Sequence, residues 1–149
     1  MATVKIVNPD GSGDYTTLAL WEDWADGQGT TDQWAECEID SVDNTSLGRV
    51  AVAGWSATSV GAYPRIYTSL AHRHNGQSGS AGAWILGSAS TTCIAITVNY
   101  VRVEGIRCVI TGLSGKGVTV ANMGSCFIDS VLVDYTGTTP TSSTFAVFC

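Results

Sequence analysis

Charged side chains are scarce in this sequence of 149 residues, since Asp, Glu, Lys and Arg together make up 13% of it, roughly half the usual share. The formal net charge is -6, with 7 basic and 13 acidic residues. Without a basic surface to neutralise phosphates, we expect no nucleic acid and no anionic membrane as a partner. The polar surface must come from Ser, Thr, Asn and Gly, a composition typical of β-structure with many turns.

Long apolar runs are also absent. The opening stretch, MATVKIVNP, is too short and too polar for a signal peptide, and no later window is long enough to span a membrane. The sequence therefore predicts a chain with no signal peptide, made in the cytoplasm and with no membrane partner.

The five cysteines are odd in number, widely spaced and never in a C-x-x-C pair. This spacing is unlike that of zinc or dithiol redox motifs and favours small buried thiols. We therefore expect no metal and no cofactor. The cysteines are Cys37, Cys93, Cys108, Cys126 and Cys149.

Helical periodicity occurs once, over residues 17–25, where Leu18, Trp21 and Ala25 share one face. Asp14 or Thr16 is the expected N-cap, and Gly27 the stop signal. After Trp34 the sequence consists of short apolar segments between turn clusters, which predicts strands. The expected strands cover residues 35–39, 49–54, 64–68, 83–87, 94–103, 106–110, 118–123, 126–133 and 144–148.

An internal repeat of about 25 residues is the most informative feature. Shifting the chain by that length lays VNYVRVEGIRCV (98–109) over MGSCFIDSVLVD (123–134). The alternation slips at Glu104-Gly105 and at Asp129-Ser130, which predicts a corner in each copy. The apolar matches in register are Val98 with Met123, Val101 with Cys126, Val103 with Ile128, Ile106 with Val131, and Cys108 with Val133.

Strand, corner and strand at a fixed period describe one coil of a β-solenoid. The predicted fold is all-β, a right-handed single-stranded parallel β-helix with one short N-terminal capping α-helix. It forms a single domain over residues 1–149, with an N-terminal strand and capping helix in 1–34 and the solenoid coils in 35–149.

The last coil is expected to be incomplete, because the shift maps Val120 onto Phe145 and Met123 onto Phe148, next to the end of the sequence. After Arg107 the charged residues are Lys116, Asp129 and Asp134, and depletion of charge is typical of interfaces. We therefore expect a homo-oligomer, or further chain, to cover the C-terminal coil.

The run NPDGSGDYTTLALWEDW resembles the N-terminal entry of right-handed parallel β-helix proteins. The ordered series DYTTLALWEDW, RHNGQSGSAGAWIL and VNYVRVEGIRC resembles the β-helix proteins of bacteriophage and environmental viral genomes. This resemblance implies the same fold and a place in a virion or a similar extracellular assembly.

The entry is more distantly similar to the pectin methylesterase and pectate lyase-like superfamily. The segments Q-A-V and D-F-I-F-G of the esterases, and W-I-D-H and R-x-P-x-x-R of the lyases, are absent from this sequence. These absences weaken an enzymatic interpretation.

Glu104 and Asp129 are the candidate catalytic residues, because one period separates them and stacks them at the same corner of adjacent coils. Two carboxylates at that spacing can share a proton, bind calcium or act as a glycosidase pair. The alternative is that both are solvated corner residues, with Glu104 balanced by Arg102 or Arg107.

His72, His74, Trp55 and Trp84 are the candidate ligand-binding residues. The two histidines share one side of an extended segment, although Asn75-Gly76 favours a loop. The tryptophans can stack on sugars, or pack in the core.

The resulting expectation is a non-catalytic structural or adhesive module of a viral particle or similar extracellular assembly. Its outer loops at 44–48 and 72–82 would meet a glycan or a neighbouring subunit, so a polysaccharide is a candidate partner. The alternatives are the N-terminal part of a polysaccharide lyase, esterase or hydrolase, and a self-assembling filament subunit.

Overall fold

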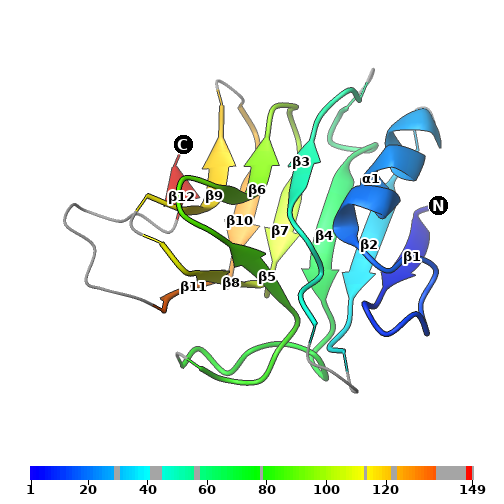
Figure 1. Cartoon of the computed structure of the whole chain (residues 1–149). Coiled ribbons are helices and arrows are strands. Elements are labelled where there is room, and N and C mark those ends of the chain that lie inside the picture. Colours follow the sequence, from blue (N-terminus) through cyan, green and yellow to red (C-terminus); the bar gives the residue numbers. More distant parts are fainter. Residues whose placement is uncertain are drawn as a thin grey trace.

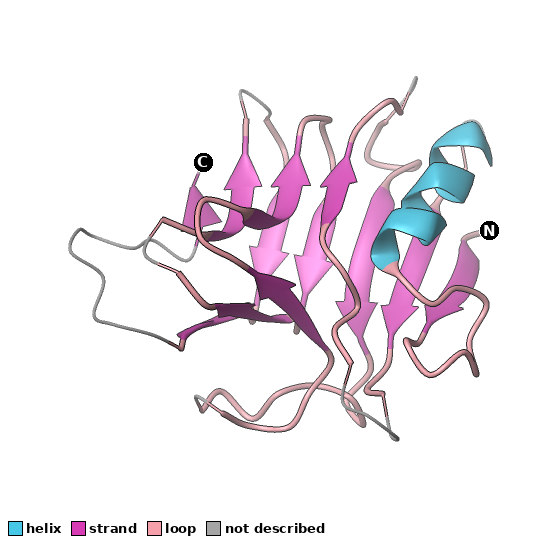
Figure 2. Cartoon of the chain, in the orientation of Figure 1, coloured by secondary structure: helices cyan, strands magenta, loops and turns pink. Residues whose placement is uncertain are grey.

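A computed structural model describes residues 1–28, 31–40, 45–55, 58–77, 79–112, 114–121, 124–136 and 147–148. In these ranges the chain forms one α-helix, one 3-10 turn and short strands (Figures 1 and 2). The elements are β1 (Thr3–Val7), α1 (Leu18–Ala25), η1 (Asp26–Gln28), β2 (Gln33–Cys37), β3 (Val50–Val52), β4 (Pro64–Thr68), β5 (Trp84–Gly87), β6 (Thr92–Ile96), β7 (Arg102–Glu104), β8 (Arg107–Ile110), β9 (Lys116–Val120), β10 (Phe127–Asp129), β11 (Leu132–Tyr135) and β12 (Val147–Phe148).

The strands form three parallel sheets, which we number in the order that the third and later coils visit them. Sheet 1 has the order β1-β2-β4-β7-β10, sheet 2 has β5-β8-β11 and sheet 3 has β3-β6-β9-β12. The first coil carries β1, and the second carries β2 and β3. The third coil (β4, β5 and β6), the fourth (β7, β8 and β9) and the fifth (β10, β11 and β12) each run from sheet 1 through sheet 2 to sheet 3. This arrangement confirms the predicted all-β solenoid with a short N-terminal helix.

The 25-residue repeat is confirmed in the last two coils. Val103 lies in register with Ile128, and Cys108 with Val133. Both predicted corners are present, because Gly105 and Ser130 adopt left-handed backbone conformations with φ of 74° and 51°. Earlier coils are longer, since along sheet 1 the partners Ala35, Ile66 and Val103 are 31 and 37 residues apart. The strand register is constant, whereas the loop length varies.

Several expected boundaries are wrong. The expected strand 94–103 is divided into β6 and β7 by a turn at Tyr100, whose φ is 60°. The expected strand 126–133 is divided by the corner at Ser130. The N-cap is Thr17, whose hydroxyl accepts from the Leu20 N–H at 3.3 Å, because Asp14 instead accepts from the Ile6 N–H. Among the expected features, Asn44, Ser78, residues 122–123, residues 144–146 and Cys149 lie outside the described residues.

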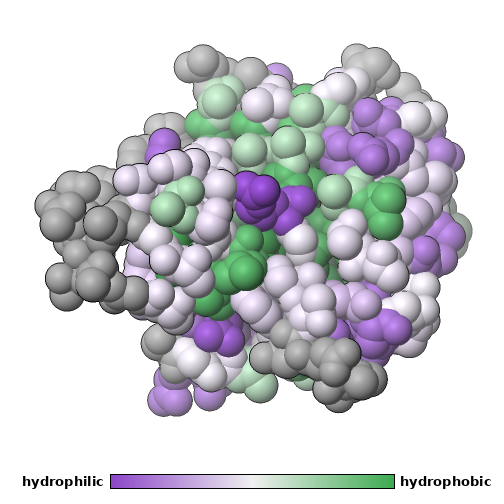
Figure 3. Space-filling view, viewed as in Figure 1, coloured by the Kyte–Doolittle hydropathy of each residue, from purple (hydrophilic) through white to green (hydrophobic). Residues whose placement is uncertain are grey.

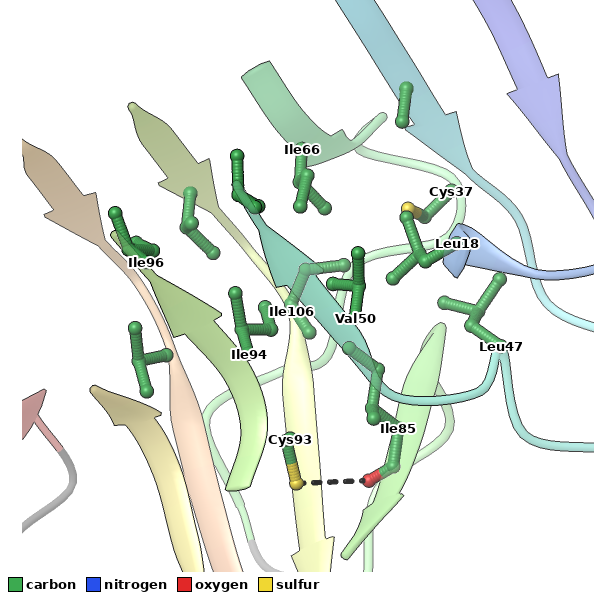
Figure 4. Packing of buried hydrophobic residues seen from close by; sticks show 14 of the residues in the cluster. Leu18, Cys37, Leu47, Val50, Ile66, Ile85, Cys93, Ile94, Ile96 and Ile106 are labelled. Carbon is green, nitrogen blue, oxygen red and sulfur yellow. Dashed lines mark hydrogen bonds between the residues drawn. The ribbon is translucent and has the colours of Figure 1, made fainter. Parts of the chain in front are cut away.

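The hydrophobic core fills the space between the three sheets (Figure 4). In β2 and β4 every second side chain is buried, as expected of strands with one face inward. Stacked isoleucines supply much of the volume and are fully covered: Ile66, Ile85, Ile94, Ile96, Ile106 and Ile110. Cys37, Cys93 and Cys108 are buried free thiols, as predicted, while Cys126 is half-buried.

Helix α1 covers the first coil beside β3 and closes that end of the core (Figure 1). Its apolar face is completely buried, with no exposed surface on Leu18, Trp21 or Ala25. The Leu18 N–H donates to the Leu47 carbonyl at 2.9 Å, which ties the start of the helix to the second coil. The predicted cap is therefore present.

Glu22 is a buried carboxylate within this cap. It is 8% exposed, and its Oε1 accepts from the Ala53 N–H at 3.0 Å and from the Trp55 indole N–H at 3.2 Å. Burial raises the pKa of Glu22 above 4.5, although these two hydrogen bonds oppose the increase. The folded protein therefore holds this proton more tightly than the unfolded chain does.

Glu22→Gln is expected to flatten part of the dependence of stability on pH. Because the folded-state pKa of Glu22 is raised, its favourable contribution is complete below pH 4.5 and is lost as pH rises through that pKa. The glutamine keeps an acceptor oxygen but does not titrate. Urea midpoints measured for both proteins from about pH 4 to pH 7 should therefore diverge, with the variant gaining relative stability toward neutral pH. Parallel curves would contradict this assignment.

The loop between β4 and β5, residues 69–77 and 79–83, crosses the corner between sheets 1 and 2, and we call it the strap. At one end its His72 Nδ1 accepts from the Ile39 N–H of the second coil at 3.2 Å. Further along, His74 Nε2 lies 2.7 Å from the Ser130 carbonyl of the fifth coil. The strap thus contacts coils on both sides of its own.

An ion pair anchors the strap. The buried carboxylate of Asp134 accepts from Arg107 Nε at 2.6 Å and from the Gly79 N–H at 3.1 Å. Arg107 also donates from Nη1 to the Ser80 carbonyl at 2.7 Å. The same two side chains therefore link the fourth and fifth coils to the strap.

Candidate functional site

The outward face of sheet 1 carries two rows of side chains set by the strand register. The first row contains one aliphatic, two aromatic and two cationic side chains, and the second contains three acids, a tyrosine and an isoleucine. In coil order the rows are Val4, Trp34, Arg65, Arg102 and Phe127, and Ile6, Glu36, Tyr67, Glu104 and Asp129. The parallel register therefore gathers charged and aromatic groups that are far apart in the sequence.

Arg65 is fixed at the centre of this face. Its guanidinium lies 4.9 Å from the Trp34 ring centroid and 4.3 Å from that of Tyr67. It also donates to both carboxylate oxygens of Glu104, at 3.0 and 2.6 Å. The hydrogen bond to Glu104 raises the pKa of Arg65 further above its ordinary value. Paired and stacked in this way, Arg65 serves as a rigid support.

Tyr67 is held in the same network. Its hydroxyl donates to Glu36 Oε2 at 2.8 Å, and burial together with this bond raises the pKa of Tyr67 to about 12. The phenol is therefore neutral at physiological pH and acts as a donor. Glu36 accepts from Tyr67 and Glu104 accepts from Arg65, so both carboxylates in the middle of sheet 1 are hydrogen-bonded.

A cavity of about 370 Å³ opens beside this network, at the corner where sheet 3 leads into sheet 1. Aromatic and aliphatic side chains supply most of its wall, with one cation among them. The lining residues are Val60, Tyr63, Tyr100, Arg102, Ser125 and Phe127. Its volume lies within the range of small-molecule sites.

Arg102 gives the cavity its charge. Its guanidinium lies 4.3 Å from the Tyr63 ring centroid, while the Tyr63 ring lies 6.1 Å from Trp34. The described part of the chain contains ion pairs at Lys5, Arg65, His72 and Arg107, and Arg102 takes part in none of them. The cavity therefore combines an aromatic wall with a cation that has no carboxylate partner there.

Two residues of the cavity have unusual backbone conformations. Tyr100 and Ser125 both have φ of 60°, a region that non-glycine residues seldom occupy. They stand 25 residues apart, at the same turn of successive coils, and the Asn99 side chain accepts from the Gly124 N–H at 2.9 Å to link those turns. Strain of this kind gathers at functional sites, where the surrounding structure maintains it.

The candidate acids Glu104 and Asp129 lie in register on adjacent strands, as the repeat predicts. The partner of Glu104 is Arg65, whereas the sequence suggested Arg102 or Arg107. Arg107 instead pairs with Asp134. Asp129 is exposed at the edge of the face. Arg65 therefore holds Glu104 through two hydrogen bonds, while Asp129 faces solvent.

The candidate tryptophans are not part of the cavity. Trp55 is 8% exposed, and its ring packs 6.4 Å from that of Trp21. Trp84 is half-buried at the start of β5, in register with Arg107 on sheet 2. Neither tryptophan lines the cavity, whose aromatic residues are Tyr63, Tyr100 and Phe127.

The candidate histidines lie in the strap and have different neighbours. His72 lies between the Ile39 N–H and Glu38, whose Oε1 is 3.8 Å from Nε2. His74 accepts at Nδ1 from the Gly76 N–H at 3.1 Å and lies against Ser130. His72 therefore contacts the second coil, and His74 contacts the fifth.

Three cavity residues with recognisable ligand-binding chemistry, Tyr63, Tyr100 and Phe127, were missed by the sequence interpretation, and Arg102 was considered only as a counter-ion. Part of the signal was present, because the 25-residue shift pairs Tyr100 with Ser125 and Arg102 with Phe127. Tyr63 could not be found in this way, because the loop lengths of its coil differ.

Two further observations concern other kinds of site. Within the described ranges, no group of three or more His, Cys, Asp or Glu side chains is arranged to hold a metal ion. In those same ranges no helix combines the length and apolar character that crossing a bilayer requires.

A more open depression of about 330 Å³ lies on the outer face of sheet 3 and is lined by Arg49, Val50, Ala51, Thr92 and Ala95. The side of the molecule that carries α1 and β3 shows small hydrophobic groups mixed with hydrophilic ones (Figure 3). With no aromatic residue in its lining, this depression is a weaker candidate than the cavity on sheet 1.

Comparison with known proteins found no matching family model, no matching curated protein and no matching solved structure. The class that the fold defines is the parallel β-solenoid.

Proposed function

We propose that this chain is a non-catalytic adhesive module that binds an acidic saccharide in the cavity on sheet 1. The observation that carries the proposal is the combination of Tyr63, Tyr100 and Phe127 with an Arg102 that lacks a carboxylate partner among the described residues. Aromatic rings offer flat apolar faces to the C–H faces of sugars, and a guanidinium binds a carboxylate in a bidentate manner.

The network beside the cavity supports binding rather than catalysis. Glu104 is held by Arg65, and Tyr67 donates to Glu36, so these groups form a rigid border to the cavity. Rigid support reduces the ordering cost that accompanies binding. The stiff solenoid suits a structural part of a viral particle or a comparable extracellular assembly, which is the setting that the entry sequence implies.

Truncation of the cavity wall is expected to weaken saccharide binding. Tyr100→Ala and Arg102→Ala should each lower the affinity for oligogalacturonate about tenfold, as loss of a central aromatic or arginine contact typically does. Arg102→Ala should also weaken the dependence of binding on salt, because it removes the charge facing the ligand. Titration calorimetry at two ionic strengths measures both effects.

Leu86→Ala is the matched control, since Leu86 is 42% exposed on the strand β5 of another sheet. A neutral oligosaccharide of equal length tests the requirement for charge. Equal affinity of the parent protein for both saccharides would rule out the proposed binding of a carboxylate by Arg102. If the parent bound neither saccharide, the proposed function would be refuted. Cleavage of oligogalacturonate by the parent would instead favour an enzyme.

A further inference from the structure

Asn75 and Gly76 are neighbours in the strap, the loop that leads from β4 to β5 (Figure 1). Asn75 is the one asparagine of the sequence that glycine follows. Attack of the Gly76 backbone nitrogen on the Asn75 side-chain carbon Cγ would close a five-membered ring. Because glycine has no side chain, its nitrogen can make this close approach more easily than that of any other residue.

His74 places a base on the nitrogen that would attack. Its Nδ1 accepts from the Gly76 N–H at 3.1 Å. Its Nε2 lies 2.7 Å from the Ser130 carbonyl, which can only accept a hydrogen bond, so Nε2 carries the proton of the neutral ring. Nδ1 therefore keeps its lone pair for the Gly76 proton. A base that a third group orients in this way is the arrangement that activates nucleophiles in enzymes.

The side-chain amide of Asn75 is also prepared for attack. Its Oδ1 accepts from the Gln77 N–H at 3.0 Å. This hydrogen bond draws electrons away from Cγ and would stabilise the negative charge that attack places on the oxygen. Asn75 is exposed, so solvent can supply water and take up the leaving group.

Contacts within the strap hold His74 in position. Gly82, on the other arm of the strap, packs against its backbone, since a Cβ at Gly82 would lie 2.8 Å from the His74 backbone nitrogen. The Ala83 N–H donates to the His72 carbonyl at 2.8 Å and joins the two arms. The base is therefore positioned before the reaction, which lowers the entropic cost of reaching the transition state.

We propose that Asn75 is a self-modification site, where His74 and Gly76 convert the side-chain amide into a carboxylate through a cyclic imide. His74 Nδ1 takes the amide proton of Gly76 as that nitrogen bonds to Asn75 Cγ. The bond from Cγ to Nδ2 then breaks, and His74 returns the proton to the departing nitrogen, which leaves as ammonia. Water opens the imide at either carbonyl and leaves an aspartyl or isoaspartyl residue at position 75.

The site does not depend on the proposed saccharide binding, because none of its residues lines the cavity on sheet 1. It does depend on the native fold, since Ser130, which orients the His74 ring, belongs to the fifth coil. Folding should therefore accelerate the reaction at Asn75. A loop without a positioned base would react no faster in the folded chain than in the unfolded one.

Incubation of the full chain at neutral pH, native and unfolded in guanidinium chloride, tests the proposal. Peptide mapping by mass spectrometry should show the replacement of the amide NH2 by OH at Asn75, and ion-exchange chromatography should resolve the added negative charge. The native chain should react at least about tenfold faster than the unfolded chain, within the usual contribution of a general base. A native rate equal to or below the unfolded rate would overturn the proposal.

His74→Gln should lower the native rate about tenfold or more, because the glutamine amide can still donate to the Ser130 carbonyl but cannot take up a proton. His72→Gln is the matched control, since His72 Nδ1 accepts from the Ile39 N–H at 3.2 Å and not from Gly76. This control should retain the rate of the parent. The proposal would also be overturned if His74→Gln reacted as fast as the parent, or if His72→Gln slowed the reaction equally.

Discussion

Trp21→Ala is expected to lower the free energy of unfolding by about 3–5 kcal/mol, the largest effect anticipated for a single substitution in this chain. Trp21 has no exposed surface and packs against Trp55, so its removal leaves a large cavity beneath α1. Domains of this kind are usually stable by only about 5–15 kcal/mol, so a large share of the stability would be lost. Urea unfolding followed by far-UV circular dichroism measures the change.

Leu20→Ala is the matched control in the same helix. Leu20 is 49% exposed, so its truncation should change stability by less than about 1 kcal/mol. Similar losses in the two variants would show that α1 does not cover the core as the structure describes. If Trp21→Ala does not fold, Trp21→Phe provides a smaller truncation, with an intermediate loss expected.

Asp134→Ala should destabilise the protein by about 2–4 kcal/mol, because it leaves the Arg107 guanidinium without its carboxylate partner. The Arg107 side chain is 14% exposed, so water compensates only part of the loss. The Gly79 N–H also loses an acceptor, and the strap should open more often. Urea midpoints and the rate of tryptic cleavage after Arg73, which lies in the strap, measure the two effects.

Asp129→Ala separates this effect from the simple loss of a negative charge. Asp129 is exposed on the neighbouring strand β10, and its removal should change stability by less than about 0.5 kcal/mol. Replacing both members of the pair, Arg107→Met with Asp134→Leu, should recover part of the loss, since no unpaired charge then stays buried. A double variant that is less stable than Asp134→Ala would contradict this explanation.

The solenoid could be predicted because its last two coils are nearly equal in length. Val103 with Ile128 and Cys108 with Val133 stand one period apart in both sequence and space. Strand ends were harder to predict, because Val101 and Val103 continue an apolar pattern through the turn at Tyr100. Local alternation does not reveal a left-handed residue that is maintained by contacts with the next coil.

The cavity was less predictable than the fold. Arg102 and Phe127 follow the repeat, but Tyr63 precedes β4 in a coil whose loop includes the strap. The strap lengthens this coil without changing the strand register. A shift of 25 residues, which pairs Tyr100 with Ser125, therefore does not pair Tyr63 with Tyr100. Conversely, Trp55 has the chemistry of a sugar platform, but the contact with α1 that buries it is not evident from its immediate sequence.

The strap also determines how the molecule would bear tension along its axis. The hydrogen bonds between coils run along that axis, so a load applied at the two ends passes through each ladder in series, and the weakest ladder separates first. The strap contacts the second coil through His72 and the fifth through His74, parallel to the ladders between them. Those ladders share the load with the strap, whereas the first coil lies outside its span and is joined to the second by the β1–β2 ladder and by the hydrogen bond from Leu18 to Leu47.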